Sequence, residues 1–438
     1  MSGAARPTPR GAKSTFHGRG KLVAAMVVDS VGTGLFIPFV IVYFLHTTSM
    51  PLAVIGVSLS AAALCALPTP VAVGVLIDRF GPQRLVGAGN LVSAAAFLAY
   101  LFVGSTWQLV AAAFVASVGQ ATFWTATRAL IGAITQSSER ATWFALQQRA
   151  RNAGYGVGGL LGAVAVSTGS RWGYLVLAAA NAASYIAAAG LVLRWSAPKL
   201  STIPLDTSST QEGVSPGPQQ ARRGTYHQLL HDRALALVCV VNLVFVLCTS
   251  VLTVLLAVYL TTVLRSPVWL SGALFTLATV LVVAAQGATT RYVSRYHRPS
   301  VLKASAACFA ASFILLWALA HAAEWLLVPG LIVSIVVFTI AEMLEGPLIN
   351  ALVVDMAPKA ASGRYLAAYQ LSWSLGGVVA PGLLTWLLTV NTGLPWAGLV
   401  ALCACAIGAT HFLPPAVTQA NPRGAPLGRV APERPPSS

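Results

Sequence analysis

The sequence predicts an all-α membrane protein with twelve transmembrane helices arranged as two six-helix pseudo-repeats. Composition is the first reason: 56% of the 438 residues are hydrophobic and only 9% are charged, whereas charged residues make up about 25% of a soluble protein. The second reason is that the apolar residues form long runs separated by short basic segments. Such runs predict helices that cross a bilayer, because about 20 mostly apolar helical residues span it with every backbone group satisfied.

Twelve segments have the length and composition of a membrane span. They are residues 22–44, 52–77, 85–103, 107–130, 153–170, 173–193, 234–263, 268–289, 301–320, 325–349, 365–388 and 394–413. The polar stretch between the sixth and seventh spans is rich in Pro, Ser, Thr and Gln and has too few apolar residues to fold alone. The expected organisation is a cytoplasmic N-terminal segment (1–21), two six-helix bundles (22–195 and 234–415), a cytoplasmic linker (196–233) and a disordered tail (416–438).

The basic residues predict the orientation. With both termini in the cytoplasm, all but two of the 27 Lys and Arg residues lie on the cytoplasmic side, the exceptions being Arg171 and Arg265. Because these residues form short groups between spans and not one basic face, the net charge of +16 does not indicate a nucleic-acid partner. We expect a monomeric, multi-pass protein of the cell membrane, with the lipid bilayer, protons and a small-molecule substrate as its partners.

Five tryptophans are expected at the outer ends of the spans, where an amphipathic ring suits the membrane interface. They are Trp107, Trp172, Trp269, Trp325 and Trp396.

No pattern in the sequence predicts an enzyme, a metal site or a cofactor. All six cysteines lie within apolar runs, so we interpret them as small hydrophobic residues and not as disulfides or zinc ligands. The chain also has no Gly-Lys-Ser/Thr phosphate-binding loop, which disfavours direct use of ATP.

A charged, turn-rich segment, GVLIDRFGPQR at residues 74–84, separates the second and third spans. Its spacing is Gly-x-x-x-Asp-Arg-x-Gly followed by a basic residue, carried by Gly74, Asp78, Arg79, Gly81 and Arg84. This spacing resembles the loop between helices two and three of the major facilitator superfamily. The resemblance implies two related six-helix halves and the function of a secondary transporter. The alternative is a solvated linker that carries positive-inside arginines.

We expect this segment to act as a cytoplasmic gate. Asp78 lies just past the second span, where it is expected to pair with Arg79, Arg84 or Arg128 and hold the cytoplasmic face shut. The corresponding segment of the second half, at residues 287–294, keeps Gly287 but has Arg291 in the position of the carboxylate. The second copy is therefore degenerate.

Two acids inside the spans are the candidate proton-coupling residues. Asp29 and Glu342 each lie roughly 10 Å from the cytoplasmic side at 1.5 Å per residue, and a charge inside a membrane is costly unless it faces a cavity or a partner. Residues 29–38, DSVGTGLFIP, resemble the first helix of the proton-driven multidrug exporters of the superfamily, which implies a protonation site at Asp29. The alternative is that both acids are structural partners of Arg128 or Arg151.

The exporter resemblance is incomplete. Residues 154–162, GYGVGGLLG, are similar to the glycine-rich fifth helix of these antiporters, but Gly159 stands where that helix usually has a proline. The arginine usual in the middle of the fourth span is replaced by Val115. Small residues at this spacing also permit close helix packing, whatever the direction of transport.

The few polar side chains within the spans are the candidate lining of a substrate cavity. They are Gln120, Trp124, Asn152, Asn181, Asn242, Glu345 and Gln370. Because they are few, we expect an apolar or amphipathic substrate, such as a drug or secondary metabolite. Together with this, the resemblance to the exporters implies proton-coupled efflux by alternating access. The alternatives are a proton-linked uptake carrier or uniporter for a small metabolite and, more remotely, a non-transporting membrane receptor or scaffold.

The predicted topology is testable with reporter fusions. Fusions after Ser438 and within residues 196–233 should report the cytoplasm, and a fusion after Thr48 should report the outside, because the basic segments stay on the cytoplasmic side. A reporter active only in the cytoplasm and one active only outside provide matched readings at each site. An outside location for the C-terminus would contradict the scheme.

Overall fold

A computed structural model describes residues 20–135, 137–195, 232–293, 295–356 and 362–413. The regular elements in these ranges are all helical, which confirms the predicted fold class. The first half contains α1 (Gly20–Phe36), η1 (Ile37–Phe39), α2 (Val40–Thr47), α3 (Leu52–Ala66), α4 (Thr69–Phe80), α5 (Pro82–Tyr100), α6 (Thr106–Ile134), α7 (Ser137–Val166) and α8 (Arg171–Leu193). The second half contains α10 (Arg233–Thr249), η3 (Val251–Leu255), α11 (Leu256–Thr262), α12 (Trp269–Val293), α13 (Arg298–Ala318), η4 (Leu319–His321), α14 (Glu324–Met356), α15 (Ser362–Val390), α16 (Leu394–Ala409) and η6 (Thr410–Phe412).

Most predicted spans coincide with helices of membrane-crossing length. Within the described ranges, nine continuous helical runs are long and apolar enough to cross a bilayer, and α3 and α4 together make a tenth. These two helices are bent by 44° next to Pro68, which has no N–H to continue the first helix. The predicted third and fifth spans coincide with α5 and α7, which carry more polar residues and fall outside this set.

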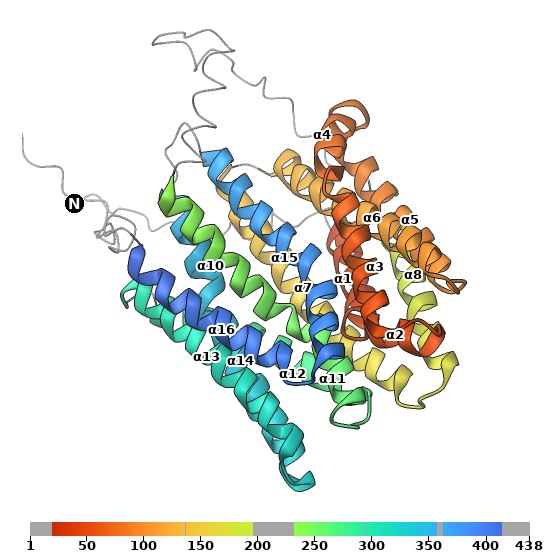
Figure 1. Ribbon diagram of the computed structural model, residues 1–438. Helices are drawn as coiled ribbons and strands as arrows, with labels where there is room; N and C mark the ends of the chain where they lie inside the picture. The colour runs from red at the N-terminus through yellow and green to blue at the C-terminus, as the bar shows by residue number, and fades with distance from the viewer. Residues whose placement is uncertain (1–19, 136, 196–231, 294, 357–361, 414–438) are drawn as a thin grey trace, which may run out of the picture.

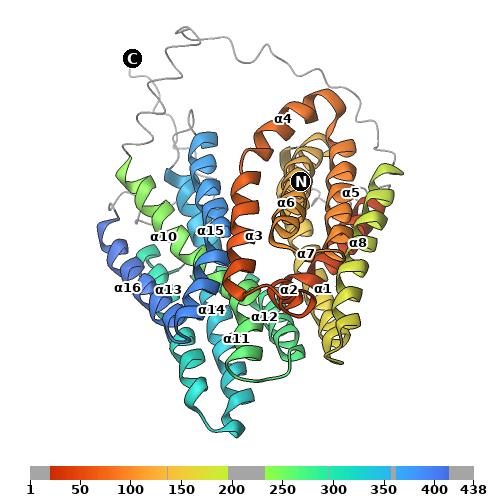
Figure 2. The same cartoon turned by 45° about the vertical axis from the view of Figure 1, so that its right-hand side comes forward.

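The helices form two bundles, α1–α8 and α10–α16, which lie side by side (Figures 1 and 2). Two long helix pairs join them: α7 packs against α12, and α3 packs against α15. Shorter contacts link α2 and η1 with α11 and η3. At the opposite end, α4 and α10 stand apart in both views. The halves therefore meet along two helix pairs and close at the end formed by α2 and α11.

Corresponding hydrogen bonds relate the two halves. The Tyr43 hydroxyl donates to the Tyr100 carbonyl (3.1 Å), and the Tyr259 hydroxyl donates to the Leu316 carbonyl (3.2 Å). Position 259 follows 43, and position 316 follows 100, by the same 216 residues. The first helix of each half is also interrupted, by the 3-10 turn η1 and by the π-helical segment η3. These matching features support an internal repeat.

Helix α7 begins at Ser137, well before residue 153, where the fifth span was expected to start. The expected span covers the apolar part of this helix, and the polar residues before it continue the same helix. The additional segment contains good helix formers, including Glu, Ala, Arg and Gln. Its Trp143 side chain is fully buried in a cluster that includes Leu22, Phe123 and Ile131. Packing on the N-terminal bundle therefore stabilises the helix in the polar segment before the expected span.

The glycines of α7 allow close contact on two sides. Cβ atoms added at Gly158 and Gly162 would collide with the backbone of α1 near Leu35. On the other side, a Cβ atom at Gly159 would lie 3.0 Å from the Thr276 hydroxyl of α12. Helix α1 belongs to the same half as α7, and α12 belongs to the other half. The glycine-rich run at residues 154–162 therefore permits close helix packing both within a bundle and between bundles, as predicted.

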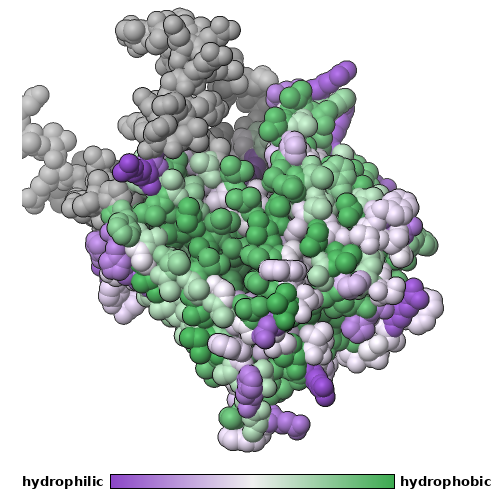
Figure 3. Space-filling model, in the orientation of Figure 1, coloured by the Kyte–Doolittle hydropathy of each residue, from purple (hydrophilic) through white to green (hydrophobic). Residues whose placement is uncertain are grey.

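The outer surface is apolar, as expected for a membrane-embedded chain. In Figure 3 hydrophobic residues cover much of the visible face, and hydrophilic residues gather toward its two ends. Four of the five predicted interface tryptophans are exposed; these are Trp107, Trp172, Trp269 and Trp325. The expectation for Trp396 was wrong: its ring is fully buried against Tyr259, with centroids 4.7 Å apart, and against Phe313.

The contact between α1 and α7 predicts a stability change. Gly158→Ala should lower the stability of the N-terminal bundle by about 1–3 kcal/mol, because the new methyl group meets backbone atoms that cannot rotate away. Gly190→Ala in α8 is the matched control, since nothing lies within 4 Å of its added Cβ atom. Thermal unfolding in detergent measures both variants. Equal melting temperatures for the two would contradict the packing described above.

Candidate functional site

Asp29 lies in a narrow polar pocket of the N-terminal bundle. Only 6% of Asp29 is exposed, and Thr33, one helical turn further along α1, shares its face. The other lining residues come from α5, α6, α7 and α8; they are Asn90, Ser93, Gln120, Phe123, Trp124, Tyr155 and Tyr185. The cavity volume of about 10 Å³ is close to the space that one water molecule needs (~10–15 Å³). Two predicted cavity residues, Gln120 and Trp124, therefore lie beside the predicted coupling acid.

Hydrogen bonding within this pocket is incomplete. The hydroxyl groups of Thr33 and Tyr185 lie 3.1 Å apart and share a hydrogen bond. In contrast, Oδ1 of Asp29 and both side-chain polar atoms of Asn90 are buried without a partner among the protein's own atoms. Buried polar groups are nearly always hydrogen-bonded, so these three unpartnered atoms make the pocket a candidate binding site. Sequence reasoning missed Asn90, because a single amide in an apolar run carries no charge signal.

Arg151 lies above the aromatic part of this site. Its guanidinium carbon is 5.2 Å from the centre of the Trp124 ring and 6.0 Å from the centre of the Tyr155 ring. Its Nη2 atom donates to Gln148 (2.8 Å), and Gln148 in turn donates to Asn152 (3.3 Å). The structure therefore places Arg151 on a helix beside the site, and not in the loop before the fifth span. Its four-residue spacing from Tyr155 is the signal that predicts this shared helix face.

Glu342 and Glu345 lie one turn apart on α14 of the C-terminal bundle. Glu345 is 3% exposed, and Glu342 is half-buried. Pro347 lies inside the same helix and has no N–H to donate to the Met343 carbonyl. Gln286 of α12 donates to that carbonyl instead, at 3.2 Å. A side chain from a neighbouring helix thus stabilises the interrupted segment that carries both acids.

The three membrane acids have no ion-pair partner among the described residues. Within the described ranges, no Lys or Arg nitrogen lies at salt-bridge distance from Asp29, Glu342 or Glu345. The alternative in which Arg128 or Arg151 pairs with them structurally therefore finds no direct contact here. Arg128 is exposed on α6.

The remaining predicted cavity residues are dispersed. Asn181 is fully buried inside the N-terminal bundle, where its side chain approaches Gly32 of α1. Asn242 is fully buried inside the C-terminal bundle and donates to the Ser372 hydroxyl at 2.7 Å. Gln370 is exposed on α15. The structure therefore brings Gln120 and Trp124 together at the pocket. Asn152 is connected to Trp124 through Gln148 and Arg151, whereas Asn181 and Asn242 lie inside their own bundles.

The predicted gate residues lie around the end of α4 and the start of α5. Gly81 ends α4 with a positive φ of 83°, a conformation that favours glycine, and its N–H donates to the Ile77 carbonyl. Asp78 and Arg84 are exposed, Gly74 has open space around it, and the Arg79 guanidinium lies over the Phe80 ring. Asp78 makes no hydrogen bond or ion pair with any described residue. Nearby, Gln83 donates to the carbonyls of Val192 and Trp195 and joins α5 to the end of α8.

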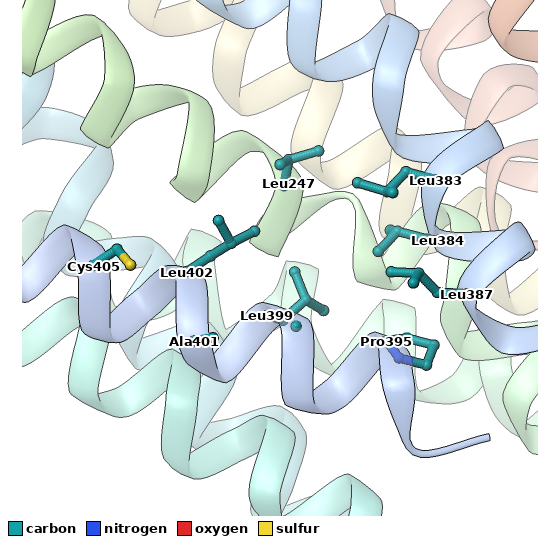
Figure 4. A pocket seen from close by; sticks show the side chains of 10 residues that line it. Leu247, Leu383, Leu384, Leu387, Pro395, Leu399, Ala401, Leu402 and Cys405 are labelled. Atoms are coloured by element: carbon teal, nitrogen blue, oxygen red, sulfur yellow. The ribbon is translucent and has the colours of Figure 1, made fainter. Parts of the chain in front are cut away.

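A second cavity has a different character. Leucine side chains of α10, α15 and α16 enclose about 300 Å³ together with Pro395 and Cys405 (Figure 4). Its lining contains none of the predicted site residues and no charged or amide group. Ligand sites combine an apolar lining with a few polar groups that orient the ligand. We therefore place the candidate functional site at the polar pocket around Asp29.

Two helical bundles with acids buried between apolar spans define a secondary transporter. The family model of the Major Facilitator Superfamily matches residues 22–381 of this chain. The chain belongs to the Major Facilitator Superfamily and is a multi-pass membrane transporter, not an enzyme. The predicted resemblance and fold class are thereby confirmed.

Two curated relatives are similar over most of their length. One is the "Na(+), Li(+), K(+)/H(+) antiporter" of Planococcus maritimus, 24% identical over 367 residues, covering 78% of this chain and 83% of the relative. The other is "Multidrug resistance protein MdtH" of Aeromonas hydrophila subsp. hydrophila, 23% identical over 362 residues, covering 82% and 85%.

Solved structures show the same fold at low sequence identity. The nucleoside transporter NupG (D323A mutant) has a TM-score of 0.73 at 12% identity and covers 91% of this chain and 100% of the solved chain. The xylose transporter XylE from E. coli, described as an inward open conformation, has a TM-score of 0.66 at 13% identity, with 90% and 96% covered. At these identities the likeness concerns the fold alone.

Proposed function

We propose that this transporter is a proton-coupled exporter of apolar or amphipathic small molecules. The observation that carries this proposal is the enclosed Asp29 carboxyl group, which has an unpartnered oxygen and no cation at salt-bridge distance. A charge in such a place is costly, so the carboxyl group is more stable there with a proton bound. Contact with water in another conformation would stabilise the charged form and favour release of the proton.

Alternating access turns this difference into coupling. A proton bound at Asp29 in one conformation and released in the other biases the equilibrium between them, because only differential binding moves a two-state equilibrium. Export then requires proton entry from outside and substrate entry from the cytoplasmic side. The contacts among α2, η1, α11 and η3 support a conformation closed at the α2 and α11 end.

The C-terminal bundle supplies the proposed substrate contacts. Glu342 and Glu345 are carboxyl groups in an apolar surrounding, which suits a cationic or amphipathic substrate and a secondary proton site. Trp124 and Tyr155 offer flat aromatic surfaces in the N-terminal bundle, held by Arg151. Gln370 and Asn152 remain candidates for polar contact. We place Asn181 and Asn242 in the supporting structure of the bundles.

The relatives support export and exchange. One relative carries the name of a cation/proton antiporter and the other that of a multidrug resistance protein. The second candidate function is a proton-linked uptake carrier or uniporter for a small metabolite, which the shared fold with nucleoside and xylose transporters keeps open. Direction of substrate movement under an imposed proton gradient separates the two. Membership of a transporter family sets aside the predicted receptor or scaffold alternative.

We further propose that the protein lies in the cell membrane as a monomer with both termini in the cytoplasm. The basic residues favour this orientation. Asp78 then faces the cytoplasm, where its exposure and lack of a partner suit an open gate. Closing would bring it to Arg79, Arg84 or Arg128.

Asp78→Asn tests the gate. Loss of the charge should destabilise the closed cytoplasmic face and slow transport by about tenfold, the equivalent of ~1.4 kcal/mol, without abolishing substrate binding. Asp78→Glu, which keeps the charge, is the control. Initial transport rates and binding constants in proteoliposomes provide the measurement. An unchanged rate in Asp78→Asn would make the residue an ordinary solvated charge.

Asp29→Asn tests the coupling. The variant should lose accumulation driven by a proton gradient while substrate binding and exchange persist, because the amide cannot take up or release the proton. Glu342→Gln should chiefly weaken the binding of cationic substrates. Transport in proteoliposomes with and without an imposed pH gradient measures both effects.

The control for these variants is Glu324→Gln, which makes the same chemical change at the exposed start of α14. It should leave transport unchanged. Full gradient-dependent accumulation by Asp29→Asn would show that Asp29 is structural, and the coupling site would then have to be sought at Glu342, Glu345 or Asp355.

A further inference from the structure

Basic and aromatic residues are concentrated where α12 ends and α13 begins. The segment at residues 291–303, RYVSRYHRPSVLK, contains three arginines, one lysine and one histidine, and it contains no Asp or Glu. Arg295 is exposed, and the two tyrosines, Tyr292 and Tyr296, are 61% and 49% exposed. The proposed gate and the proposed coupling site use none of these side chains.

The two tyrosines form a pair on the surface. Their ring centroids lie 5.1 Å apart, and the Tyr296 hydroxyl donates to the Tyr292 hydroxyl at 2.7 Å. The hydrogen of the Tyr292 hydroxyl therefore remains to be donated elsewhere. Exposed tyrosines at the end of a membrane helix suit the boundary between lipid headgroups and acyl chains, because the ring is apolar and the hydroxyl is polar.

Lys303 adds a positive charge that is held by a neutral group. Its Nζ atom lies 3.0 Å from Nε2 of His411 in η6. An ammonium group can only donate, so Nε2 accepts, and Nδ1–H donates to the Ile407 carbonyl at 3.1 Å. Among the described residues, no carboxylate lies at salt-bridge distance from Lys303, and its other two N–H groups make no hydrogen bond. The charge of Lys303 thus stays uncompensated at this end of α13.

Three helices bring these groups to one end of the C-terminal bundle. Helix α12 ends there, α13 begins there, and η6 follows the end of α16 and contacts α13 (Figure 1). In the proposed orientation this end faces the cytoplasm. We name the group of side chains the basic surface of the C-terminal bundle; its members are Tyr292, Arg295, Tyr296, Arg298, Lys303 and His411.

The chemistry of this surface fits an anionic headgroup. Arginine, lysine and the tyrosine hydroxyl all donate hydrogen bonds, and cationic donors bind phosphate strongly. Clusters of Lys and Arg directly beside membrane helices attract the anionic lipids of the cytoplasmic leaflet. A soluble phosphate compound would account for the basic residues but not for the exposed tyrosine rings. A lipid accounts for both, because its phosphate meets the cations and its acyl chains meet the rings.

We propose that the basic surface binds the headgroup of an anionic phospholipid. Arg295 and Lys303 contact the phosphate, and the rings of Tyr292 and Tyr296 lie against the start of the acyl chains. His411 is a positioning residue, since it accepts from Lys303 and holds its ammonium group at the surface. The proposed orientation serves only to name the leaflet, and proton coupling does not enter the argument.

Binding of tritiated dioleoyl phosphatidylglycerol to the purified full chain in mixed detergent micelles tests this proposal. We expect saturable binding that unlabelled phosphatidylglycerol displaces, and that neither phosphatidylcholine with the same acyl chains nor inorganic phosphate displaces. Lys303→Gln should weaken the binding by about fivefold, the effect of removing one basic residue beside an anionic lipid surface. Arg194→Gln is the matched control, because it removes one exposed positive charge at the end of α8 in the other bundle.

Three results would overturn the lipid site: displacement by phosphatidylcholine as effective as by phosphatidylglycerol, displacement by inorganic phosphate, or equal weakening in Lys303→Gln and Arg194→Gln. Melting curves identify a misfolded Lys303→Gln, and Arg295→Gln then serves as the second variant with the same expected weakening. Proton-driven transport is measured separately in proteoliposomes. Lipid binding without such transport would refute the proposed function alone, and transport without selective lipid binding would refute the lipid site alone.

Discussion

The close packing of α7 is the constraint on which the rest of the structure depends. Its glycines bring the backbone of α1 into contact on one side and α12 on the other. The Thr276 hydroxyl of α12 donates to the Gly156 carbonyl across this second contact (3.0 Å). Asp29 lies on α1, and Tyr155 and Arg151 lie on α7. Helix α7 thus lies between α1, which carries Asp29, and α12 of the opposite bundle.

The two bundles hold their buried acids in different surroundings. The N-terminal bundle encloses Asp29 among neutral polar side chains and covers it with aromatic rings and Arg151. The C-terminal bundle holds its two acids on α14, beside a helix interruption at Pro347 that Gln286 of α12 stabilises. Because α12 also contacts α7, a shift at that interface involves both sites. Spatial continuity alone does not measure coupling, which requires a difference in free energy between two conformations.

The sequence predicts the fold well because hydropathy, helix length and basic segments each report directly on the membrane. It identifies Asp29 as a candidate coupling residue, and Gln120 and Trp124 as candidate cavity residues, for a related reason, since polar residues within apolar runs are rare; the structure brings the three together. It misplaces polar residues whose environment depends on packing. The buried Trp143 extends α7, so Arg151 lies on a helix beside Trp124 and not in a loop.

Residues with one amide group show the same limit. Asn90, Asn181 and Asn242 have equivalent sequence surroundings, yet Asn90 lines the pocket while the other two lie inside their bundles. Only the rotation of each helix about its axis separates these outcomes. Apolar residues on every side of a membrane helix leave that rotation undetermined by periodicity.

The interface between the bundles contains few strong interactions, and this has an energetic consequence. Among the described residues, two hydrogen bonds cross it: the Thr276 hydroxyl donates to the Gly156 carbonyl, and the Gly382 N–H donates to the Ser60 hydroxyl (2.8 Å) beside Pro381. Such bonds contribute about 0.6 kcal/mol each on average between membrane helices. A hundredfold proton gradient supplies about 2.7 kcal/mol per proton. The proton transfer proposed at Asp29 would therefore supply more than the roughly 1.2 kcal/mol that these two bonds contribute together, so these polar contacts alone would not prevent the proposed change of conformation.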